Sequence, residues 1–284
     1  MAITRSRDRA GALADALAAA GAEPVLVPLI DFEVAPDAAA LDASLQCLAA
    51  GEYLWLVVSS ITTVRALKQW CAGHSTTLAE LVPATTRVAT IGPSSRRILE
   101  AEGLAVELAP VDIQSADGLV ALWPPGTGEV LVPHSNLAEP GLEEGIAAAG
   151  FHVDAVIAYV TVDYPARESH RLTAVLAPSK DWAADTATAP VAAGHPLLTP
   201  AEAAAEVRSG AINAVVAASG SAARRIHTLL APLPAECLLI AIGQPTRAES
   251  ERLGMDVAAT ATHPTPAGIV DALVCARSTA RPTV

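Results

Sequence analysis

VATIGPSSRRILEAEGLAVEL, residues 88–108, returns later in the chain as LIAIGQPTRAESERLGMDVAA, residues 239–259. Each copy begins with a short apolar run, passes through an Ile-Gly turn and continues with helical periodicity. Each then reaches a glycine, Gly103 or Gly254, of the kind that commonly ends a helix before the next strand. The stretch therefore predicts the same strand–helix–strand unit twice.

The repetition extends to most of the chain. AITRS and LADALAAAG within 2–21 return as LVPHS and LEEGIAAAG within 131–150. LVVSSITTVRAL at 56–67 returns as VVAASGSAARRI at 215–226. This internal duplication predicts two similar half-molecules with a cleft between them. Because ligands favour domain interfaces, function is expected between the copies.

Composition favours a protein of the cytoplasm with two buried cores. The 284 residues are 52% hydrophobic, with a mean hydropathy of +0.40. No apolar run reaches the roughly 18 residues of a membrane span, and no secretory signal opens the chain. The four cysteines form no CxxC pair. We expect reduced thiols, no metal and no membrane partner.

The net charge of −12 argues against a nucleic-acid partner, because phosphate binding needs a clustered basic face. The basic residues of this chain are scattered instead. An anionic ligand would therefore have to be bound by local backbone N–H groups and a few arginines.

Short β-rich runs alternate with helical segments along the chain, which is typical of α/β layers around parallel sheets. Thr199-Pro200-Ala201-Glu202 is a capping box with proline at the first helical position. Gly21 and Gly150 mark two further helix ends. We predict two doubly wound parallel-sheet domains. The expected strands are Val25–Ile30, Leu54–Ser59, Arg87–Ile91, Val130–Pro133, Asn213–Ala217 and Leu238–Ile242.

Four turns from strand to helix carry the candidate binding chemistry, because doubly wound sheets bind ligands at the carboxyl ends of their strands. At each turn the first helical N–H groups lack an intrahelical partner and the helix dipole is positive, which suits a carboxylate or phosphate. For any single turn, an ordinary helix cap is the alternative. The turns are Ser59-Ser60, Gly92-Pro93-Ser94-Ser95, Ser219-Gly220-Ser221 and Gly243-Gln244-Pro245-Thr246.

These motifs, taken in order, resemble the uroporphyrinogen-III synthase family. Thr4-Arg5 matches the family's pair after the first strand, and VVSSITTVRAL matches a strand that ends in serine. TIGPSSRRIL and AIGQPTRAES match its Gly-Pro-x-Thr turns. Tyr159 in AYVTV matches a strand tyrosine, and HPTPAGIV at 263–270 matches a late SPTPxxL segment. The resemblance spans nearly the whole chain.

The resemblance implies two α/β domains joined by a two-stranded β ladder, with one domain built from both ends of the chain. Residues 1–30 and 166–284 would form one domain, which includes a loop insertion at 166–198. Residues 38–156 would form the other, and 31–37 and 157–165 would be the crossing strands.

The family reaction belongs to heme biosynthesis and needs no cofactor. A lyase of this family closes the linear tetrapyrrole hydroxymethylbilane to uroporphyrinogen III, with loss of water and inversion of ring D. Loss of the ring A hydroxyl gives an azafulvene-like cation, which the substituted α-carbon of ring D attacks to form a spiro intermediate. The resemblance implies a monomer that holds a polyanionic substrate of eight carboxylates in a fixed geometry.

The same resemblance assigns roles to residues. Tyr159 would be catalytic, donating a hydrogen bond to the leaving hydroxyl. Independently of the resemblance, the internal repeat places His134 after a strand end equivalent to that of Arg5, which makes it the one histidine of interest. The substrate-binding residues would be Arg5, Ser60, Ser94, Ser95, Ser219, Ser221 and Thr246.

Two other classes stay open. A non-catalytic ligand-binding or regulatory module could retain the same two-domain clamp, although the presence of Tyr159 argues against it. An NAD- or nucleotide-dependent enzyme is disfavoured, because the chain has neither a P-loop nor a GxGxxG fingerprint. No GxSxG elbow supports a serine hydrolase.

Overall fold

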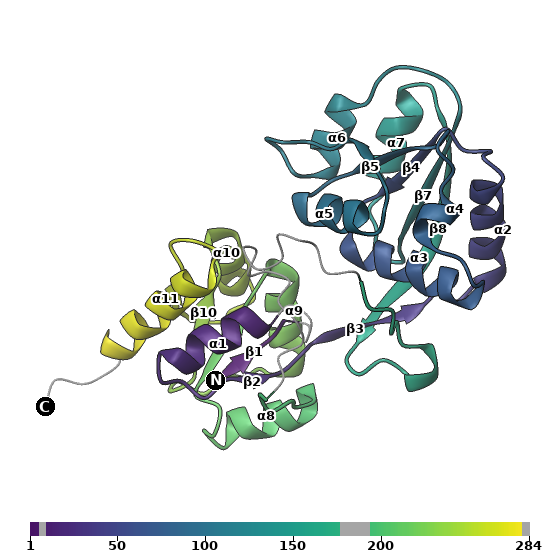
Figure 1. Cartoon of the computed structure of the whole chain (residues 1–284). Coiled ribbons are helices and arrows are strands. Elements are labelled where there is room, and N and C mark those ends of the chain that lie inside the picture. The colour runs from purple at the N-terminus through teal and green to yellow at the C-terminus, as the bar shows by residue number, and fades with distance from the viewer. Residues whose placement is uncertain (6–9, 177–193, 280–284) are drawn as a thin grey trace, which may run out of the picture. The chain divides into compact units, whose positions relative to one another are not determined.

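The computed structural model describes residues 1–5, 10–176 and 194–279. Helices alternate with strands, and the strands form one five-stranded and one six-stranded sheet. The chain divides into two compact units (Figure 1). The first unit comprises Met1–Asp31, Asp163–Pro165 and the described residues 194–279, and the second comprises Phe32–Val162 and 166–176.

The first unit is built on a parallel sheet in the order β11-β10-β9-β1-β2. Its strands are β1 (Ala2–Ile3), β2 (Val25–Leu26), β9 (Ala214–Ala217), β10 (Leu238–Ala241) and β11 (Val257–Thr260). Its helices are α1 (Gly11–Ala19), α8 (Pro200–Arg208), α9 (Gly220–Leu229), α10 (Gln244–Arg252) and α11 (Pro266–Thr279).

The core of the first unit lies on both faces of this sheet. Ala214 and Val216 of β9 pack with apolar residues of α1 and α11, whereas Val215 and Ala217 pack with those of α8 and α9. Successive strand residues point to opposite faces, so a strand covered on both sides reads as an uninterrupted apolar run. This is why AVVA in β9 could be predicted from sequence.

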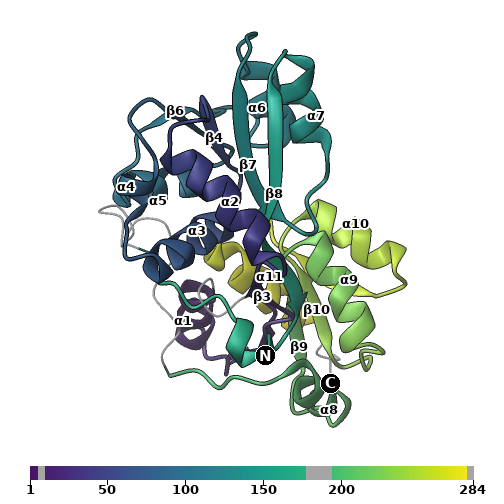
Figure 2. The same ribbon diagram turned by 90° about the vertical axis from the view of Figure 1, so that its right-hand side faces the viewer.

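The second unit contains the six-stranded sheet, in the order β3-β8-β7-β4-β5-β6. Its strands are β3 (Ile30–Val34), β4 (Trp55–Val58), β5 (Arg87–Thr90), β6 (Val106–Leu108), β7 (Glu129–Ser135) and β8 (His152–Asp163). Its helices are α2 (Ala38–Ala49), α3 (Ile61–Gly73), α4 (Leu78–Leu81), α5 (Pro93–Ala101), α6 (Ala116–Leu122) and α7 (Gly141–Ala148). Figure 2 shows α7 on one side of β7 and β8, and α2 on the other.

Strands β3 and β8 are hydrogen-bonded neighbours, and the chain passes from one unit to the other within each of them. The Tyr164 N–H, just after β8, donates to the Leu29 carbonyl, just before β3, at 3.3 Å. The end of one strand therefore lies beside the start of the other, and the pair is antiparallel. The other strand pairs of the six-stranded sheet whose registers are known run parallel.

The sequence repeat corresponds to equivalent positions in the two sheets. Strands β11, β10, β9 and β1 of the first unit match β6, β5, β4 and β7 of the second, and both sets follow the same spatial order. A surface ion pair is also repeated. Arg96 and Glu100 on α5 are 2.9 Å apart, and Arg247 and Glu251 on α10 are 2.7 Å apart.

The predicted α/β class with parallel sheets is confirmed, as are several predicted helix boundaries. Thr199 and Glu202 form the reciprocal capping box at the start of α8. Gly21, Gly103, Gly150 and Gly254 all have positive φ, a conformation that glycine adopts without a steric cost.

The expected insertion at 166–198 lies partly outside the described residues, at 177–193. The described part differs from expectation, because 166–176 belongs to the second unit rather than to the domain that contains the chain ends. Two side chains of α3 account for the difference. Arg65 donates to the Leu172 and Ala174 carbonyls, and Gln69 accepts hydrogen bonds from the Thr173 and Ala174 N–H groups.

Within the described ranges, none of the helices has the length and apolar character required to cross a bilayer.

Candidate active site

All four predicted turns lie where a parallel strand ends and a helix begins. In the second unit, β4 leads to α3 and β5 leads to α5. In the first unit, β9 leads to α9 and β10 leads to α10. The four helix N-termini are thus at the carboxyl edge of their sheets, where α/β proteins bind ligands.

Two of these helices are capped by the predicted serines. Ser60 precedes α3, and its hydroxyl accepts a hydrogen bond from the Thr63 N–H at 3.1 Å. Ser219 precedes α9 and accepts from the Ala222 N–H at the same distance. Ser221 lies 3.0 Å from Ser219, oxygen to oxygen. Ser60 and Ser219 therefore act as ordinary helix caps, which leaves their hydroxyl hydrogens to bind other groups.

Helices α5 and α10 are different, because a glycine stands at each cap. Among the described residues, no side chain caps the first turn of either helix, and proline occupies one of its first two positions. The backbone N–H groups of Ser94 and Ser95 in α5, and of Gln244 and Thr246 in α10, are therefore the ones directed toward an anion. These two N-termini are the better candidates for carboxylate binding.

The side chains at these two turns lie differently from what the motifs suggested. Ser95 is 5% exposed and Thr246 is 4% exposed, so both residues are largely buried. Both are the third residue of their helix, within its first turn. Ser94 is half-buried. The backbone N–H groups of the first turn are the donors that both helices offer in common.

Tyr159 and Ser60 are brought together by the fold. The Tyr159 phenol oxygen lies 3.2 Å from the Ser60 Oγ, although 99 residues separate them in the chain. Tyr159 lies on β8 and is 6% exposed. The Phe32 and Tyr159 rings pack edge to face, with their centroids 5.7 Å apart. The ring is thus fixed by packing and the phenol oxygen by a hydrogen bond.

A short chain of hydroxyls continues from Tyr159. The Ser60 Oγ lies 2.9 Å from the Thr63 Oγ1, and Thr63 is fully buried. In each of these pairs either oxygen could be the donor. Tyr159 can therefore donate its proton to Ser60, or donate it elsewhere while it accepts from Ser60. Because either oxygen of the pair can be the donor, the buried phenol can donate its hydrogen bond to an incoming group.

Arg5 and His134 lie at the ends of equivalent strands. Arg5 follows Thr4, whose hydroxyl donates to the Val216 carbonyl of β9 at 2.6 Å, and Arg5 itself is half-buried. The His134 Nδ1 lies 3.2 Å from a carboxylate oxygen of Glu143. A carboxylate therefore already faces His134, which makes this side chain poorly suited to hold a substrate anion.

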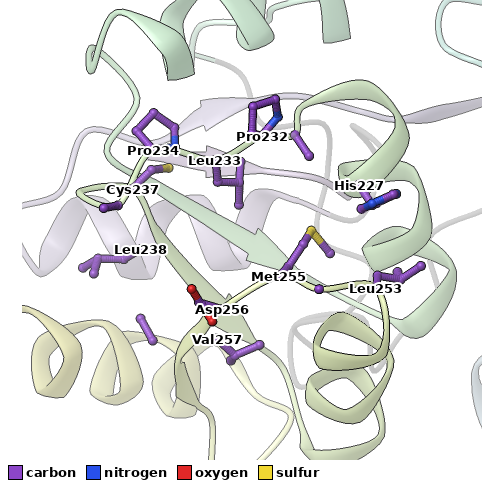
Figure 3. A pocket seen from close by; sticks show the side chains of 14 residues that line it. His227, Pro232, Leu233, Pro234, Cys237, Leu238, Leu253, Met255, Asp256 and Val257 are labelled. Carbon is purple, nitrogen blue, oxygen red and sulfur yellow. The ribbon is translucent and has the colours of Figure 1, made fainter.

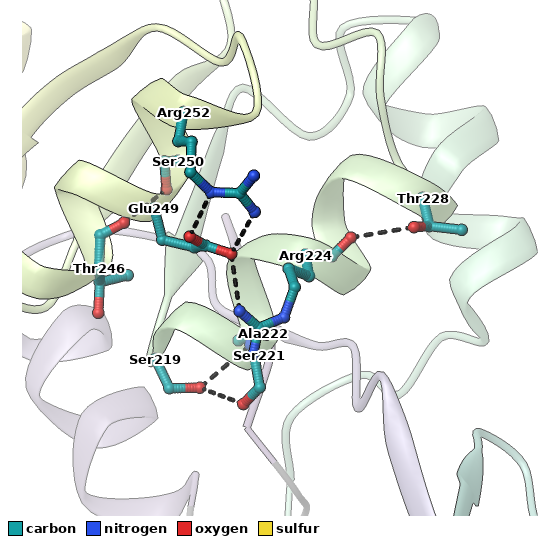
Figure 4. A network of polar contacts seen from close by, with 9 residues as sticks. All are labelled: Ser219, Ser221, Ala222, Arg224, Thr228, Thr246, Glu249, Ser250 and Arg252. Atoms are coloured by element: carbon teal, nitrogen blue, oxygen red, sulfur yellow. Dashed lines mark hydrogen bonds and ion pairs between the residues drawn. The ribbon is translucent and has the colours of Figure 1, made fainter.

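An ion network that the sequence motifs do not predict joins α9 to the end of α10 (Figure 4). The Glu249 carboxylate accepts hydrogen bonds from Arg224 at 2.7 Å and from the Arg252 Nε at 2.8 Å. Those two guanidinium groups hold the pKa of Glu249 well below its usual range, at about 2. The Glu-x-x-Arg spacing within α10 was visible in the sequence, but the partnership with Arg224 depends on how α9 packs against α10.

A cavity of about 600 Å³ lies at the opposite edge of the first unit's sheet (Figure 3). It is lined by residues at the start of β10 and β11, among them Cys237, Leu238, Met255 and Val257. Burial raises the pKa of the Cys237 thiol, which therefore stays protonated. The lining includes none of the predicted site residues. Across the described ranges, no three His, Cys, Asp or Glu side chains gather so that they could hold a metal ion.

Comparison with known proteins identifies a matching family. The family model described as uroporphyrinogen-III synthase HemD matches residues 11–271. A search of the curated proteins gives no match. A crystal structure of mutant uroporphyrinogen III synthase from Thermus thermophilus is 15% identical, over 98% of both chains, with a TM-score of 0.61. Uroporphyrinogen-III synthetase from Helicobacter pylori is 12% identical, over 88% of this chain and 92% of that chain, with a TM-score of 0.53.

Proposed function

Because the chain belongs to the uroporphyrinogen-III synthase family, the cyclising lyases of heme biosynthesis, we propose how its residues serve that cyclisation. Tyr159 assists departure of the hydroxyl from hydroxymethylbilane, and Ser60 holds the phenol in place. The open first turns of α5 and α10 bind substrate carboxylates, together with Arg5 and the turn at Ser219 and Ser221. The single observation that carries this proposal is the contact between Tyr159 and Ser60.

The leaving-group step needs a proton donor near a group that becomes water. A phenol donates well, and at neutral pH it keeps its proton. When the bilane hydroxyl replaces Ser60 as the acceptor from Tyr159, Ser60 can turn its own hydrogen toward the phenol oxygen. Burial of Tyr159 keeps competing water away, which strengthens a hydrogen bond to a group that develops charge.

The substrate is a polyanion, and the protein carries a net charge of −12. Binding must therefore rely on local donors that act against the overall field. Uncapped helix N-termini supply such donors without adding a charged side chain, because their N–H groups and the helix dipole both favour an anion. Helices α5 and α10 each offer one, and they occupy equivalent positions in the two sheets.

We further propose that the two compact units are the two domains of the family architecture, with β3 and β8 as the crossing strands. The protein would act as a cytoplasmic monomer without a nucleic-acid partner. The scattered basic residues and the acidic balance of the chain support the absence of nucleic acid. Sedimentation of the purified protein would test its oligomeric state.

The activity is tested with freshly generated hydroxymethylbilane. Products are oxidised and the type I and type III isomers are separated, because unassisted closure yields the symmetric type I isomer. Type III product at a rate proportional to enzyme concentration is expected. If type I alone forms, at the rate seen without protein, the chain is the non-catalytic module instead. Calorimetry with the bilane would then show whether binding remains.

A further inference from the structure

The pairing of β7 with β8 is irregular at the position of Tyr159. The two strands run parallel, with Pro133 opposite Val156 and His134 opposite Ile157. The next residue of β7, Ser135, lies opposite Tyr159 rather than Ala158. Ala158 is therefore an extra residue on β8, which makes this position a β-bulge.

The bulge changes the face of the sheet to which Tyr159 belongs. Side chains of a regular strand alternate, so Tyr159 would share a face with Ile157, which is 38% exposed. Ala158 and Tyr159 are instead buried in succession, at 1% and 6% exposure. The extra residue thus turns the tyrosine to the side where Ser60 caps α3.

Asn136 holds the backbone of β8 directly after this bulge. It directly follows β7, and its N–H donates to the Tyr159 carbonyl at 3.2 Å. Its side-chain Oδ1 accepts a hydrogen bond from the Thr161 N–H at 2.8 Å and from the Ser135 hydroxyl at 3.2 Å. Where β7 ends, the two peptide groups that flank Val160 are therefore both held by Asn136, the first by its backbone N–H and the second by its side chain.

We infer that Asn136 is a positioning residue, which fixes the bulge that directs the Tyr159 phenol to Ser60. Its side-chain oxygen binds the Ser135 hydroxyl and the Thr161 N–H rather than the phenol, so its effect on the phenol passes through the backbone of β8. The inference rests on the proposed role of Tyr159 for its effect on turnover. Its structural part, the orientation of the ring, does not depend on that role.

The orientation of the ring can be measured without activity, because the sequence contains three tyrosines. Protein labelled with 3-fluorotyrosine would give three fluorine resonances, and Tyr159→Phe identifies one of them by its loss. Asn136→Ala should shift or broaden that resonance while those of Tyr53 and Tyr164 stay in place. Asn136→Asp keeps an acceptor oxygen for the Thr161 N–H and should restore the original position.

Turnover supplies the second measurement. We expect Asn136→Ala to lower kcat for type III product about tenfold, with KM within twofold, because displacement of a reacting group impairs the chemical step more than binding. Asn136→Asp should recover most of the loss. In the Tyr159→Phe background, Asn136→Ala should cause no further loss, since coupled residues do not act additively. Asn213→Ala, which removes the same amide from an exposed site in the first unit, is the matched control.

The outcomes separate the two proposals. If the Tyr159 resonance is unmoved in Asn136→Ala, Asn136 does not position the ring and the inference is overturned. If the resonance moves but neither Asn136→Ala nor Tyr159→Phe changes kcat, Asn136 positions a tyrosine that the reaction does not use, and the proposed role of Tyr159 fails. If Asn136→Ala does not fold, the test passes to Asn136→Asp, whose Tyr159 resonance and kcat must match those of the parent. A shifted resonance and a lowered kcat in Asn136→Asp also overturn the inference.

Discussion

The phenol oxygen of Tyr159 lies 3.2 Å from the hydroxyl oxygen of Ser60, the residue that caps α3. The contact joins the last strand of the second unit to a helix at the carboxyl edge of the same sheet. One of its partners stabilises a helix, and the other is the proposed donor to the leaving group. Substitution of either residue therefore distinguishes a structural role from a chemical one.

Tyr159→Phe should lower kcat about tenfold and leave the fold intact. Loss of one donor to a developing charge costs more than that at the most favourable sites, but departure of a hydroxyl from a pyrrolylmethanol is already facile. Steady-state rates of type III formation, together with thermal melting, measure both effects. Tyr164→Phe is the control and should retain turnover within twofold. Unchanged kcat in Tyr159→Phe at saturating substrate would leave this tyrosine a structural role only.

Gly243→Asp should weaken substrate binding without harm to stability. The φ of Gly243 is −178°, which any residue adopts, and a Cβ placed there would have the Pro245 Cδ as its nearest neighbour, at 3.9 Å. Aspartate at this position can accept the Thr246 N–H as a helix cap, so the melting temperature should stay the same or rise slightly. The same carboxylate would repel the bilane and raise KM about tenfold. Gly243→Ala, which adds neither cap nor charge, should change KM less than threefold; equal KM values for the two variants would exclude α10 as an anion site.

Glu249→Gln should lower the melting temperature at pH 7 and have little effect in acid. The folded-state pKa of Glu249 is about 2, below its ordinary value of 4.5. A lowered pKa means that ionised Glu249 stabilises the folded state above pH 4.5 and that this contribution is lost as pH falls toward 2. Melting curves of parent and variant should therefore converge across this range, and salt should reduce their difference at pH 7, because Arg224 and Arg252 are mostly exposed. Glu251→Gln, which removes an exposed helical pair, is the control; a difference that persisted undiminished at pH 2 would contradict the assignment.

Gln69→Ala should expose the amides of Thr173 and Ala174 to hydrogen exchange. The side-chain oxygen of Gln69 accepts from these two N–H groups at 2.7 and 3.1 Å, in the way a neighbouring strand would. Their exchange should quicken about tenfold or more in the variant, because Arg65 donates to carbonyls of this segment and, having no acceptor atom, cannot replace Gln69. Gln46→Ala, whose glutamine contacts Asp42 on α2, provides the comparison. Equal exchange in all three proteins would show that the amides are protected by something else.

The fold could be predicted largely because its signals are local. Buried parallel strands such as Trp55–Val58 are apolar throughout, and the helix ends carry caps and glycines within a few residues. The repeat added the expectation of two similar sheets. The motifs predict Tyr159 and Ser60 as site residues, but they do not predict their contact, since it depends on how β8 and α3 pack.

The features that sequence reasoning missed depend on packing between elements. The burial of Ser95 and Thr246 follows from the rotation of α5 and α10 about their axes, which a turn motif does not determine. The bulge at Ala158 depends on the register between β7 and β8, and a slip of one residue exchanges the faces of a strand. The segment 171–174 lies beside α3 because Arg65 and Gln69 of that helix form hydrogen bonds with its backbone.

The pairing of β1 with β9 has a consequence for the order of folding. Ala2 pairs with Val215, whereas Trp55 in the second unit pairs with Arg87 and Val130. The pairing of Ala2 with Val215 closes a longer loop than either pairing of Trp55. It therefore costs more chain entropy and forms more slowly. During synthesis the second unit can complete its parallel sheet while β9 is still within the ribosome. We therefore expect the middle of the chain to fold first, and strand β1 to remain exposed to chaperones and to self-association until the last third of the protein has been made.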